Sequence, residues 1–173
     1  MAATFTVETG TGSTTANAYA TVAQVDQYNE DHDGNTTYSV LSDTLKEKAI
    51  RLATQYLDNW YGSRWKGTRT NDTQALDWPR AYVVDSDGYG IDADDMPQRL
   101  KDACAEAAVI SGAGTELLPD LSDDGNVKRT KVKVDVIEQE VEYSGSNSPY
   151  TQYSNIDRLL RGLLQPGGQV RRA

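Results

Sequence analysis

The sequence is poor in cysteine, histidine and phenylalanine, each of which occurs once among 173 residues. The lone Cys104 excludes an internal disulfide and any metal site built from several cysteines, and it fits a reducing compartment. The lone His32 excludes zinc motifs that need two histidines. Ten tyrosines supply most of the aromatic surface, and tyrosine tolerates half-wetted positions such as protein interfaces.

Long apolar runs are also missing. No segment is long enough to span a bilayer, and the first residues, MAATFTVETG, lack the basic and apolar regions of a signal peptide. We therefore expect no membrane partner.

Motifs of common enzymes are absent as well. Neither a phosphate-binding GxxxxGK[ST] loop nor a GxSxG nucleophile elbow occurs. The stretch DSDGYGID, residues 85–92, looks like a calcium loop, but Val83 stands where the first ligand should be, and Asp94 is too short for the last. Cys104 lies on an apolar helical face and is expected to be a buried small hydrophobe. We predict that the protein is not an enzyme and uses no cofactor or metal.

The charges divide the chain into an acidic body and a basic tail. Residues 1–126 contain 21 acidic and 9 basic residues, whereas residues 127–173 contain 5 acidic and 8 basic ones. The body, with a net charge of −12, should repel nucleic acid. The tail, with a net charge of +3, suits either an acidic partner surface or a solvated end, and charge alone leaves both open.

Capping signals and apolar periodicity predict a small helical bundle. A capping box at Thr21 and Gln24 opens a helix that ends near residue 33. Ser42 caps a second helix over 43–61, and Pro97 opens a third over 97–112. The core stripe expected on the second helix consists of Leu45, Ala49, Leu52, Ala53, Tyr56 and Trp60.

The strongest β pattern is VKRTKVKVDVIEQEVEY, residues 127–143. Val132, Val134 and Val136 alternate with polar residues and are the expected inter-subunit strand, because an unpaired strand edge is a template for a neighbour. A phase shift after Val136 indicates a bulge or bend. A weaker alternation predicts a short strand over residues 4–8.

The predicted fold class is α+β and mainly α: a small helical bundle with an extended β strand or hairpin and a C-terminal docking helix. The expected division is a helical core domain with an N-terminal arm over 1–126, a β element over 127–143, and a linker with a C-terminal arm over 144–173.

The connection over 62–97 is long and weakly patterned, so side chains must anchor it, and the three candidates are Trp65, Trp78 and Tyr82. The basic and aromatic residues around TQALDWPR can be interpreted as a surface for stacking single-stranded nucleic acid or as a structural corner. The negative field of the body favours the corner, with Trp78 buried, Pro79 setting the turn and Arg80 paired with a carboxylate. The residues assigned to it, the WPR corner, are Trp65, Trp78, Pro79 and Arg80.

The last expected helix, over 155–164, has a leucine face and an arginine face. Because it follows a flexible linker, the leucine face is expected either to dock on another protein or to fold back onto its own domain. The residues assigned to docking are Ile156, Arg158, Leu159, Leu160, Arg161, Leu163, Leu164, Arg171 and Arg172.

The order of motifs resembles a family of tailed-phage proteins that are described as putative DnaT-like single-stranded DNA-binding proteins and that sit among the head–tail connector adaptors. The resemblance covers nearly the whole chain, from TFTVETGTG to IDRLLRGLL. Its most specific parts are TQALDWPR, residues 73–80, and the stretch MPQRLKDACAEAA that contains Pro97.

This resemblance implies a structural virion protein at the neck of a bacteriophage, made in the host cytoplasm. Such adaptors form a homo-oligomeric ring of about twelve copies that binds the portal and the next neck or tail protein. Double-stranded DNA passes through the lumen during genome ejection without specific binding. The alternatives are a single-stranded DNA-binding protein, which the acidic body disfavours, and a neck stopper or tail-completion protein.

Overall fold

The computed structural model describes residues 4–32, 34–118, 127–133, 138–143 and 153–165. The chain divides into two compact units, of which one comprises Met1–Leu117 with Tyr153–Ala173 and the other Leu118–Gln152. The C-terminal helix thus groups with the other helices, whereas the sequence had suggested a separate arm from residue 144. None of the helices in the described residues has the length and apolar character needed to cross a bilayer.

The helices α1 (Val22–Asp31), α3 (Asp43–Tyr61) and α4 (Gln98–Gly112) correspond to the helices expected from the sequence. The capping box of α1 is complete, since the Thr21 side chain accepts the Gln24 N–H and the Gln24 side chain accepts the Thr21 N–H. An additional short helix, α2 (Thr36–Ser39), is capped by Asn35. Its single turn is too short to show a period of 3.6 residues, so the sequence does not reveal it.

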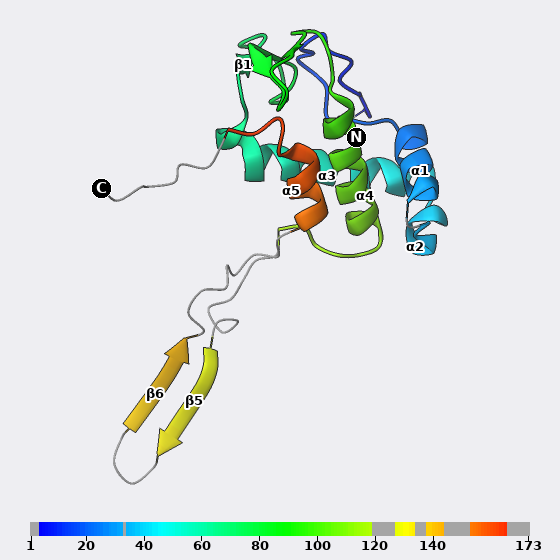
Figure 1. Cartoon of the computed structure of the whole chain (residues 1–173). Coiled ribbons are helices and arrows are strands. Elements are labelled where there is room, and N and C mark those ends of the chain that lie inside the picture. The colour runs from blue at the N-terminus through cyan, green and yellow to red at the C-terminus, as the bar shows by residue number, and fades with distance from the viewer. Residues whose placement is uncertain (1–3, 33, 119–126, 134–137, 144–152, 166–173) are drawn as a thin grey trace, which may run out of the picture. The chain divides into compact units, whose positions relative to one another are not determined.

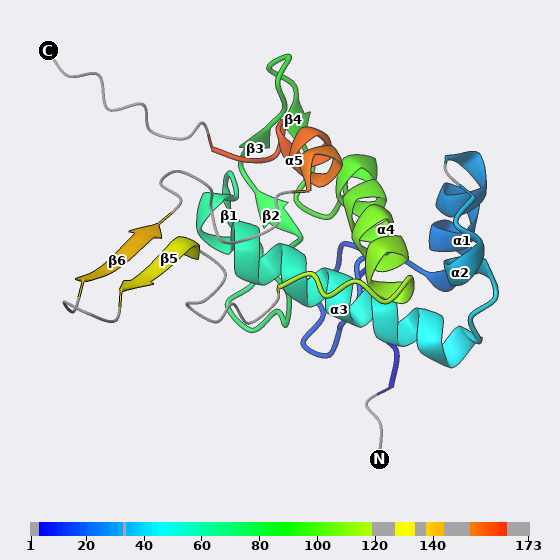
Figure 2. The ribbon, with the colours of Figure 1, turned by 90° about the horizontal axis from the view of Figure 1, so that it is seen from below.

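Helix α4 is the centre of the helical unit, where it packs against α1, α3 and α5 (Ser154–Leu160) (Figures 1 and 2). Its packing faces are rich in alanine, and Ala103, Ala107 and Ala108 are fully buried. Small side chains allow neighbouring helices to approach closely, which explains how one short helix can pack against several others.

The buried face of α3 is rotated relative to the stripe expected from the sequence. Ala49, Ala53 and Tyr56 are buried as expected, but Leu45 and Leu52 are 49% and 43% exposed. Ile50 and Leu57 are buried in their place. Both sets recur at helical spacing, so periodicity alone could not decide which one is buried.

The connection between α3 and α4 is built from short pieces. It begins with the 3-10 turn η1 (Gly62–Arg64), after which β1 (Thr68–Arg69) pairs with β2 (Arg80–Ala81). A second small hairpin joins β3 (Val83–Val84) to β4 (Gly90–Ile91).

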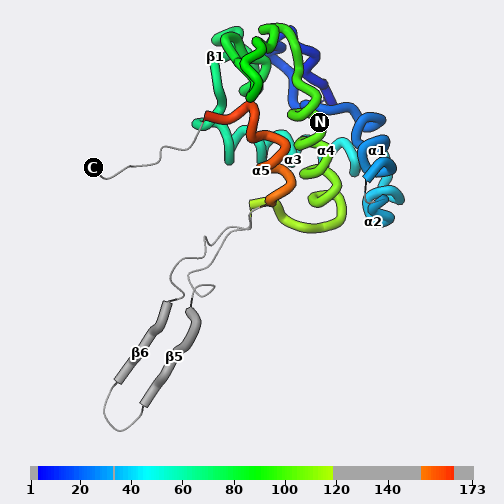
Figure 3. Tube along the Cα trace, in the orientation of Figure 1, coloured from blue at the N-terminus to red at the C-terminus, as the bar shows by residue number. Residues whose placement is uncertain are grey.

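The N-terminal segment packs against this connection (Figure 3). The Ala75 N–H donates to the Ser13 carbonyl at 2.9 Å. The strand expected over residues 4–8 is reduced to one bridge, Val7 with Ala18.

The second unit contains the antiparallel strands β5 (Val127–Lys133) and β6 (Glu138–Tyr143). The β element is therefore a hairpin with a register shift between Val127 and Arg129, whereas the bulge or bend expected after Val136 lies outside the described residues. Helices with small antiparallel hairpins make the fold α+β and mainly α, as the sequence predicted.

Candidate functional site

The two tryptophans of the WPR corner pack against each other inside the helical unit. Trp65 and Trp78 are 1% and 0% exposed, and their rings meet edge to face at a centroid distance of 5.8 Å. Trp65 also contacts the ring of Tyr61 at the end of α3. Pro79 is buried and follows a cis peptide bond. The tryptophans therefore anchor the long connection to α3.

Arg80 bonds to the backbone rather than to the carboxylate that the sequence suggested. Its Nε donates to the Lys66 carbonyl at 2.8 Å, Nη2 to the Gly67 carbonyl at 2.9 Å, and Nη1 to the Asp77 carbonyl at 3.1 Å. The guanidinium thus fastens two distant stretches of the connection to each other. Burial lowers the pKa of Arg80, while the nearby charge of Asp77 opposes that shift.

A buried polar cluster ties the corner to α3. The Tyr19 hydroxyl donates to Asp58 Oδ1 at 2.5 Å and accepts the Trp78 N–H at 3.2 Å. The Asp77 N–H donates to Asp58 Oδ2 at 3.2 Å. Burial raises the pKa of Asp58 to about 7, although the bond from Tyr19 favours the ionised form. Burial also raises the pKa of Asp77.

The raised pKa of Asp58 predicts that stability falls as the pH rises. The folded chain holds this proton up to about pH 7, whereas an unfolded chain releases it near 3.8. The stabilisation from this proton is complete below pH 3.8, the pKa in the unfolded chain, and is lost as the pH rises to about 7, the pKa in the folded chain. We expect the free energy of unfolding to be roughly 1–3 kcal/mol lower at pH 8 than at pH 5, less than the full three-unit shift would give because Asp58 is partly solvated.

Urea unfolding at several pH values, followed by circular dichroism, would measure this dependence. Asp58→Asn should flatten it, because the amide does not ionise. Asp43→Asn is the matched control, since Asp43 is exposed in the first turn of the same helix. A wild-type profile without slope, or an unchanged slope in Asp58→Asn, would contradict the assignment.

The burial of both tryptophans removes them as stacking platforms for bases. The exposed aromatic residues of the connection are Tyr82 and Tyr89, which are 88% and 74% exposed and flank the β3–β4 hairpin. Tyr82 has a positive φ of 61°, which is uncommon outside glycine. Asp85 Oδ1 accepts the N–H groups of Asp87 and Tyr89, so that the predicted calcium-like stretch is a self-bonded turn. The sequence placed Tyr82 among the anchors of the connection, which its exposure contradicts, and it did not single out Tyr89, which belongs to no periodic pattern.

Glu8 forms a second polar centre that the sequence reasoning missed. Its carboxylate is 2% exposed and accepts the N–H groups of Thr9, Gly10, Gly12 and Ser13 at 2.8–3.1 Å. Both glycines have positive φ, which lets successive N–H groups converge on one anion. The glycine-rich TGTGS loop thus binds a carboxylate of its own chain. The position of Glu8 just before the two glycines was the feature of the sequence that could have predicted this contact.

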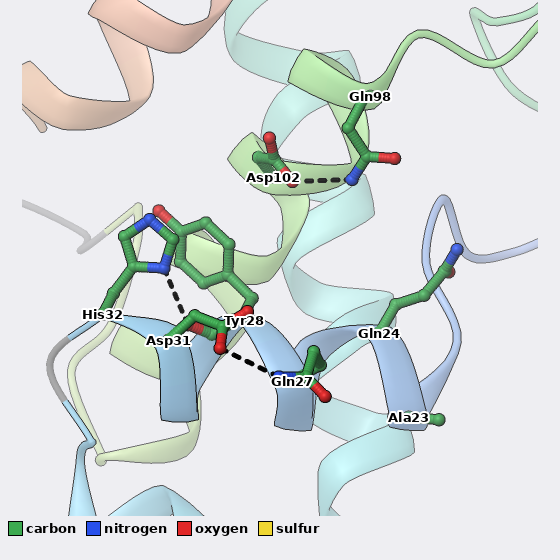
Figure 4. Close-up of a pocket in the computed structure, with 8 residues that line it drawn as sticks. All are labelled: Ala23, Gln24, Gln27, Tyr28, Asp31, His32, Gln98 and Asp102. Atoms are coloured by element: carbon green, nitrogen blue, oxygen red, sulfur yellow. Dashed lines mark hydrogen bonds between the residues drawn. The ribbon is translucent and has the colours of Figure 1, made fainter.

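An open pocket of about 360 Å³ lies between α1 and α4 (Figure 4). The rings of Tyr28 and His32 stack at a centroid distance of 4.0 Å, and His32 Nδ1 lies 2.8 Å from the Tyr28 carbonyl. Other polar groups bond along their own helices, for example Gln98 Nε2 to Asp102 Oδ1. The lining residues are Ala23, Gln24, Gln27, Tyr28, Asp31, His32, Gln98 and Asp102.

This pocket carries no evident chemistry. Two of its hydrogen bonds join side chains of one helix, and the Tyr28 hydroxyl of α1 donates to Glu106 of α4 at 3.1 Å, so these bonds hold the helices and do not converge on a point where a substrate could react. Across the part of the chain that the structure describes, no group of three or more His, Cys, Asp or Glu residues could hold a metal ion.

The leucine face of α5 folds back onto its own domain, which is the second of the two alternatives left open by the sequence. Four residues of the expected docking set, Ile156, Leu160, Leu163 and Leu164, are 0–5% exposed. Arg158 and Arg161 are exposed, and Leu159 is half-buried. A docking surface on α5 is therefore limited to its arginine side, whereas Arg171 and Arg172 lie outside the described residues.

Among the three valines assigned to the inter-subunit strand, Val132 lies in β5, where it pairs in register with Gln139 of β6. Val134 and Val136 lie outside the described residues. The valine pattern thus predicted the position of β5. Its partner strand β6 lies in the same chain and begins at Glu138, and four residues separate it from the end of β5 at Lys133.

Neither curated proteins nor solved structures include a significant match to this chain. The model of one protein family matches residues 3–173, almost the full length. That family is described as "Putative DnaT-like ssDNA binding protein", and the extent of the match shows that the chain belongs to it.

Proposed function

We propose that the protein is a structural subunit of the head–tail neck of a tailed bacteriophage. In this proposal it forms an adaptor ring between the portal and the rest of the neck or tail, and double-stranded DNA passes through the ring. The observation that carries the proposal is the β5–β6 hairpin, which forms a compact unit of its own and whose sheet has two strands.

A two-stranded hairpin is marginally stable in water without a third strand or a helix packed on it. Among the described residues each strand of this hairpin has one partner, which leaves its outer edge without a strand to pair with. Strand addition is a common way for one protein chain to recognise another. The hairpin is thus suited to assembly with other chains, which a repeated ring subunit requires.

The negative charge of the protein supports a ring whose central passage does not bind the DNA that moves through it. The net charge of −9 opposes the phosphate backbone, and the two tryptophans that could stack on bases are buried. The surface available for the portal includes the exposed Arg158 and Arg161 of α5. We therefore propose a cationic contact to an acidic portal surface rather than insertion of the leucine face.

Binding of single-stranded DNA is the second candidate function. The description of the family and the two exposed tyrosines, Tyr82 and Tyr89, favour it. A cation also reaches the β3–β4 hairpin, since Lys66 Nζ donates to the Val84 carbonyl at 2.9 Å as well as to the Gly162 carbonyl at 2.8 Å. Against it, Asp85 and Asp87 lie between the two tyrosines in the sequence and add negative charge.

Native mass spectrometry of the full chain with the portal ring of the same phage tests the first candidate. We expect uptake of about twelve copies onto a portal of that symmetry. Arg158→Glu with Arg161→Glu should abolish uptake without changing the melting temperature, whereas Lys48→Glu, an exposed cation on α3, should have no effect. Uptake unaffected by the arginine reversals would exclude the α5 contact. No uptake would leave a stopper or tail-completion role to be tested with the next neck protein.

Titration with a fluorescent oligonucleotide at ~50 and ~200 mM salt tests the second candidate, since phosphate binding weakens steeply over this range. We expect no binding at either salt concentration. The DNA-binding function would be favoured instead if the oligonucleotide binds in a salt-sensitive way, if Tyr82→Ala and Tyr89→Ala weaken that binding, and if the portal takes up no copies.

A further inference from the structure

The two strands of the hairpin carry opposite charges. Strand β5 contains four cationic residues, Lys128, Arg129, Lys131 and Lys133, and no acidic one. Strand β6 contains three acidic residues, Glu138, Glu140 and Glu142, and no cationic one. This separation places a positive strand at one edge of the sheet and a negative strand at the other.

The register explains part of this arrangement within one chain. Arg129 pairs with Glu142, Lys131 with Glu140, and Lys133 with Glu138. The pairs between them, Thr130 with Val141 and Val132 with Gln139, carry no charge. Charged and uncharged pairs therefore alternate along the register of the hairpin. In antiparallel sheets generally, opposite charges at paired positions are modestly favourable and like charges are unfavourable.

Cations and acids could alternate along each strand and still pair with opposite charges within the chain. The separation of charge between the two strands is therefore not required by the internal pairs, but it does affect how one hairpin meets another. Two hairpins can meet edge to edge in three ways: β5 to β5, β6 to β6, or β5 to β6 of the next copy. The first arrangement places cations opposite cations and the second places acids opposite acids, and both are unfavourable. The third repeats the opposite-charge pairing found within the chain.

We propose that β5 of one copy pairs with β6 of the next, so that the hairpin sets a head-to-tail order of subunits. The proposal rests on the neck-ring function above and specifies the surface through which neighbouring copies meet. A head-to-tail contact uses a different surface on each partner, and it generates a ring when the rotation closes. In a closed ring every copy uses both edges, which leaves no strand edge open to unrelated chains.

Disulfide trapping between variants that each carry one introduced cysteine tests which strands meet. Thr130→Cys marks β5 and Gln139→Cys marks β6, both at uncharged positions of the register. The native Cys104 is fully buried, so the unmodified chain provides the baseline. Each variant carries one reactive cysteine, so any disulfide between introduced cysteines joins two copies of the full chain.

The two variants, one of them extended by a mass tag, are mixed at high concentration and oxidised mildly. We expect cross-links between β5 and β6 to exceed those within either variant alone by roughly tenfold, because like charges oppose the other two arrangements. Thr44→Cys on the exposed surface of α3 reports random collisions. Equal or greater cross-linking within one variant, or none above the Thr44→Cys level, would overturn the proposal.

A charge-exchanged chain provides a second test. It combines Arg129→Glu, Lys131→Glu and Lys133→Glu with Glu138→Lys, Glu140→Lys and Glu142→Lys, so that opposite charges still pair within the hairpin. Cross-links between β5 and β6 should persist among exchanged chains and fall to the baseline between exchanged and wild-type chains. Free mixing of the two would show that charge does not select the neighbour.

The portal experiment separates this inference from the function on which it rests. Portal uptake without β5-to-β6 cross-links in the assembled ring would retain the neck role and overturn the hairpin contact. Cross-links between β5 and β6 without portal uptake would retain the contact and overturn the neck role.

Discussion

Replacing Trp78 by alanine is expected to lower the free energy of unfolding by about 3–5 kcal/mol, since removing a buried tryptophan loses its burial and leaves a cavity. Trp78 is 0% exposed and meets the ring of Trp65 edge to face. Its backbone N–H donates to the Tyr19 hydroxyl, a bond that alanine would retain, so the expected loss comes from the buried indole ring and its packing against Trp65. Loss of the side chain should therefore loosen the whole connection between α3 and α4.

Urea unfolding followed by circular dichroism measures this change, with the slope m as a check that the unfolded states are comparable. Trp78→Phe should cost less, because it retains an aromatic ring at the same position. Tyr89→Ala is the matched control: this aromatic side chain is 74% exposed, and its removal should change stability by less than ~0.5 kcal/mol. A loss below ~1 kcal/mol for Trp78→Ala would mean that the corner does not anchor the fold.

Truncating the chain after Tyr150 is expected to remove most of its stability. The truncation deletes α5, whose Ile156 and Leu160 are fully buried against the helical unit. Asp157 Oδ1 also accepts the Tyr61 hydroxyl at 2.7 Å, and the Gln165 N–H donates to the Arg64 carbonyl at 2.7 Å. Each buried leucine or isoleucine contributes roughly 2–5 kcal/mol when compared with alanine, which is large relative to a total of ~5–15 kcal/mol.

The interpretation of α5 as a separate docking arm predicts the opposite result, namely a truncated chain that stays folded. Thermal unfolding distinguishes the two, and Leu160→Ala provides a milder variant if the truncated chain cannot be purified. That substitution alone should cost ~2–5 kcal/mol. A truncated chain with the wild-type melting temperature would restore the docking-arm interpretation.

Removing the hairpin unit while keeping α5 is the matched control. Residues 119–150 can be replaced by a short Gly/Ser linker, because the Tyr153 hydroxyl donates to the Glu116 carbonyl at 3.3 Å and the two attachment points are therefore close. This deletion should leave the melting temperature of the helical unit nearly unchanged, since the removed residues belong to a different compact unit.

The sequence by itself determined the main helices. Their starts are set by local interactions, such as the capping box at Thr21 and the proline at Pro97, and their lengths by apolar periodicity. The β character of residues 127–143 follows from alternation in the same way, and the net charge of −9 can be read directly. All of these depend on residues that are close together in the chain.

Only the tertiary structure decided which faces and partners these elements use. Two apolar sets on α3 had the same period, and the packing of the fold buried Ile50 and Leu57 while leaving Leu45 and Leu52 partly exposed. The leucine face of α5 could serve another protein or its own core equally well from its pattern, and packing against α4 assigned it to the core.

The polar partners were equally inaccessible to sequence reasoning. Arg80 was expected to find a carboxylate, but the fold placed the carbonyls of Lys66 and Gly67 within its reach, and these groups are 14 and 13 residues away in the chain. Asp58 acquires its raised pKa from burial beside Tyr19, which is 39 residues distant. Burial and long-range hydrogen bonds depend on how distant segments meet, and a pattern of neighbouring residues does not contain that information.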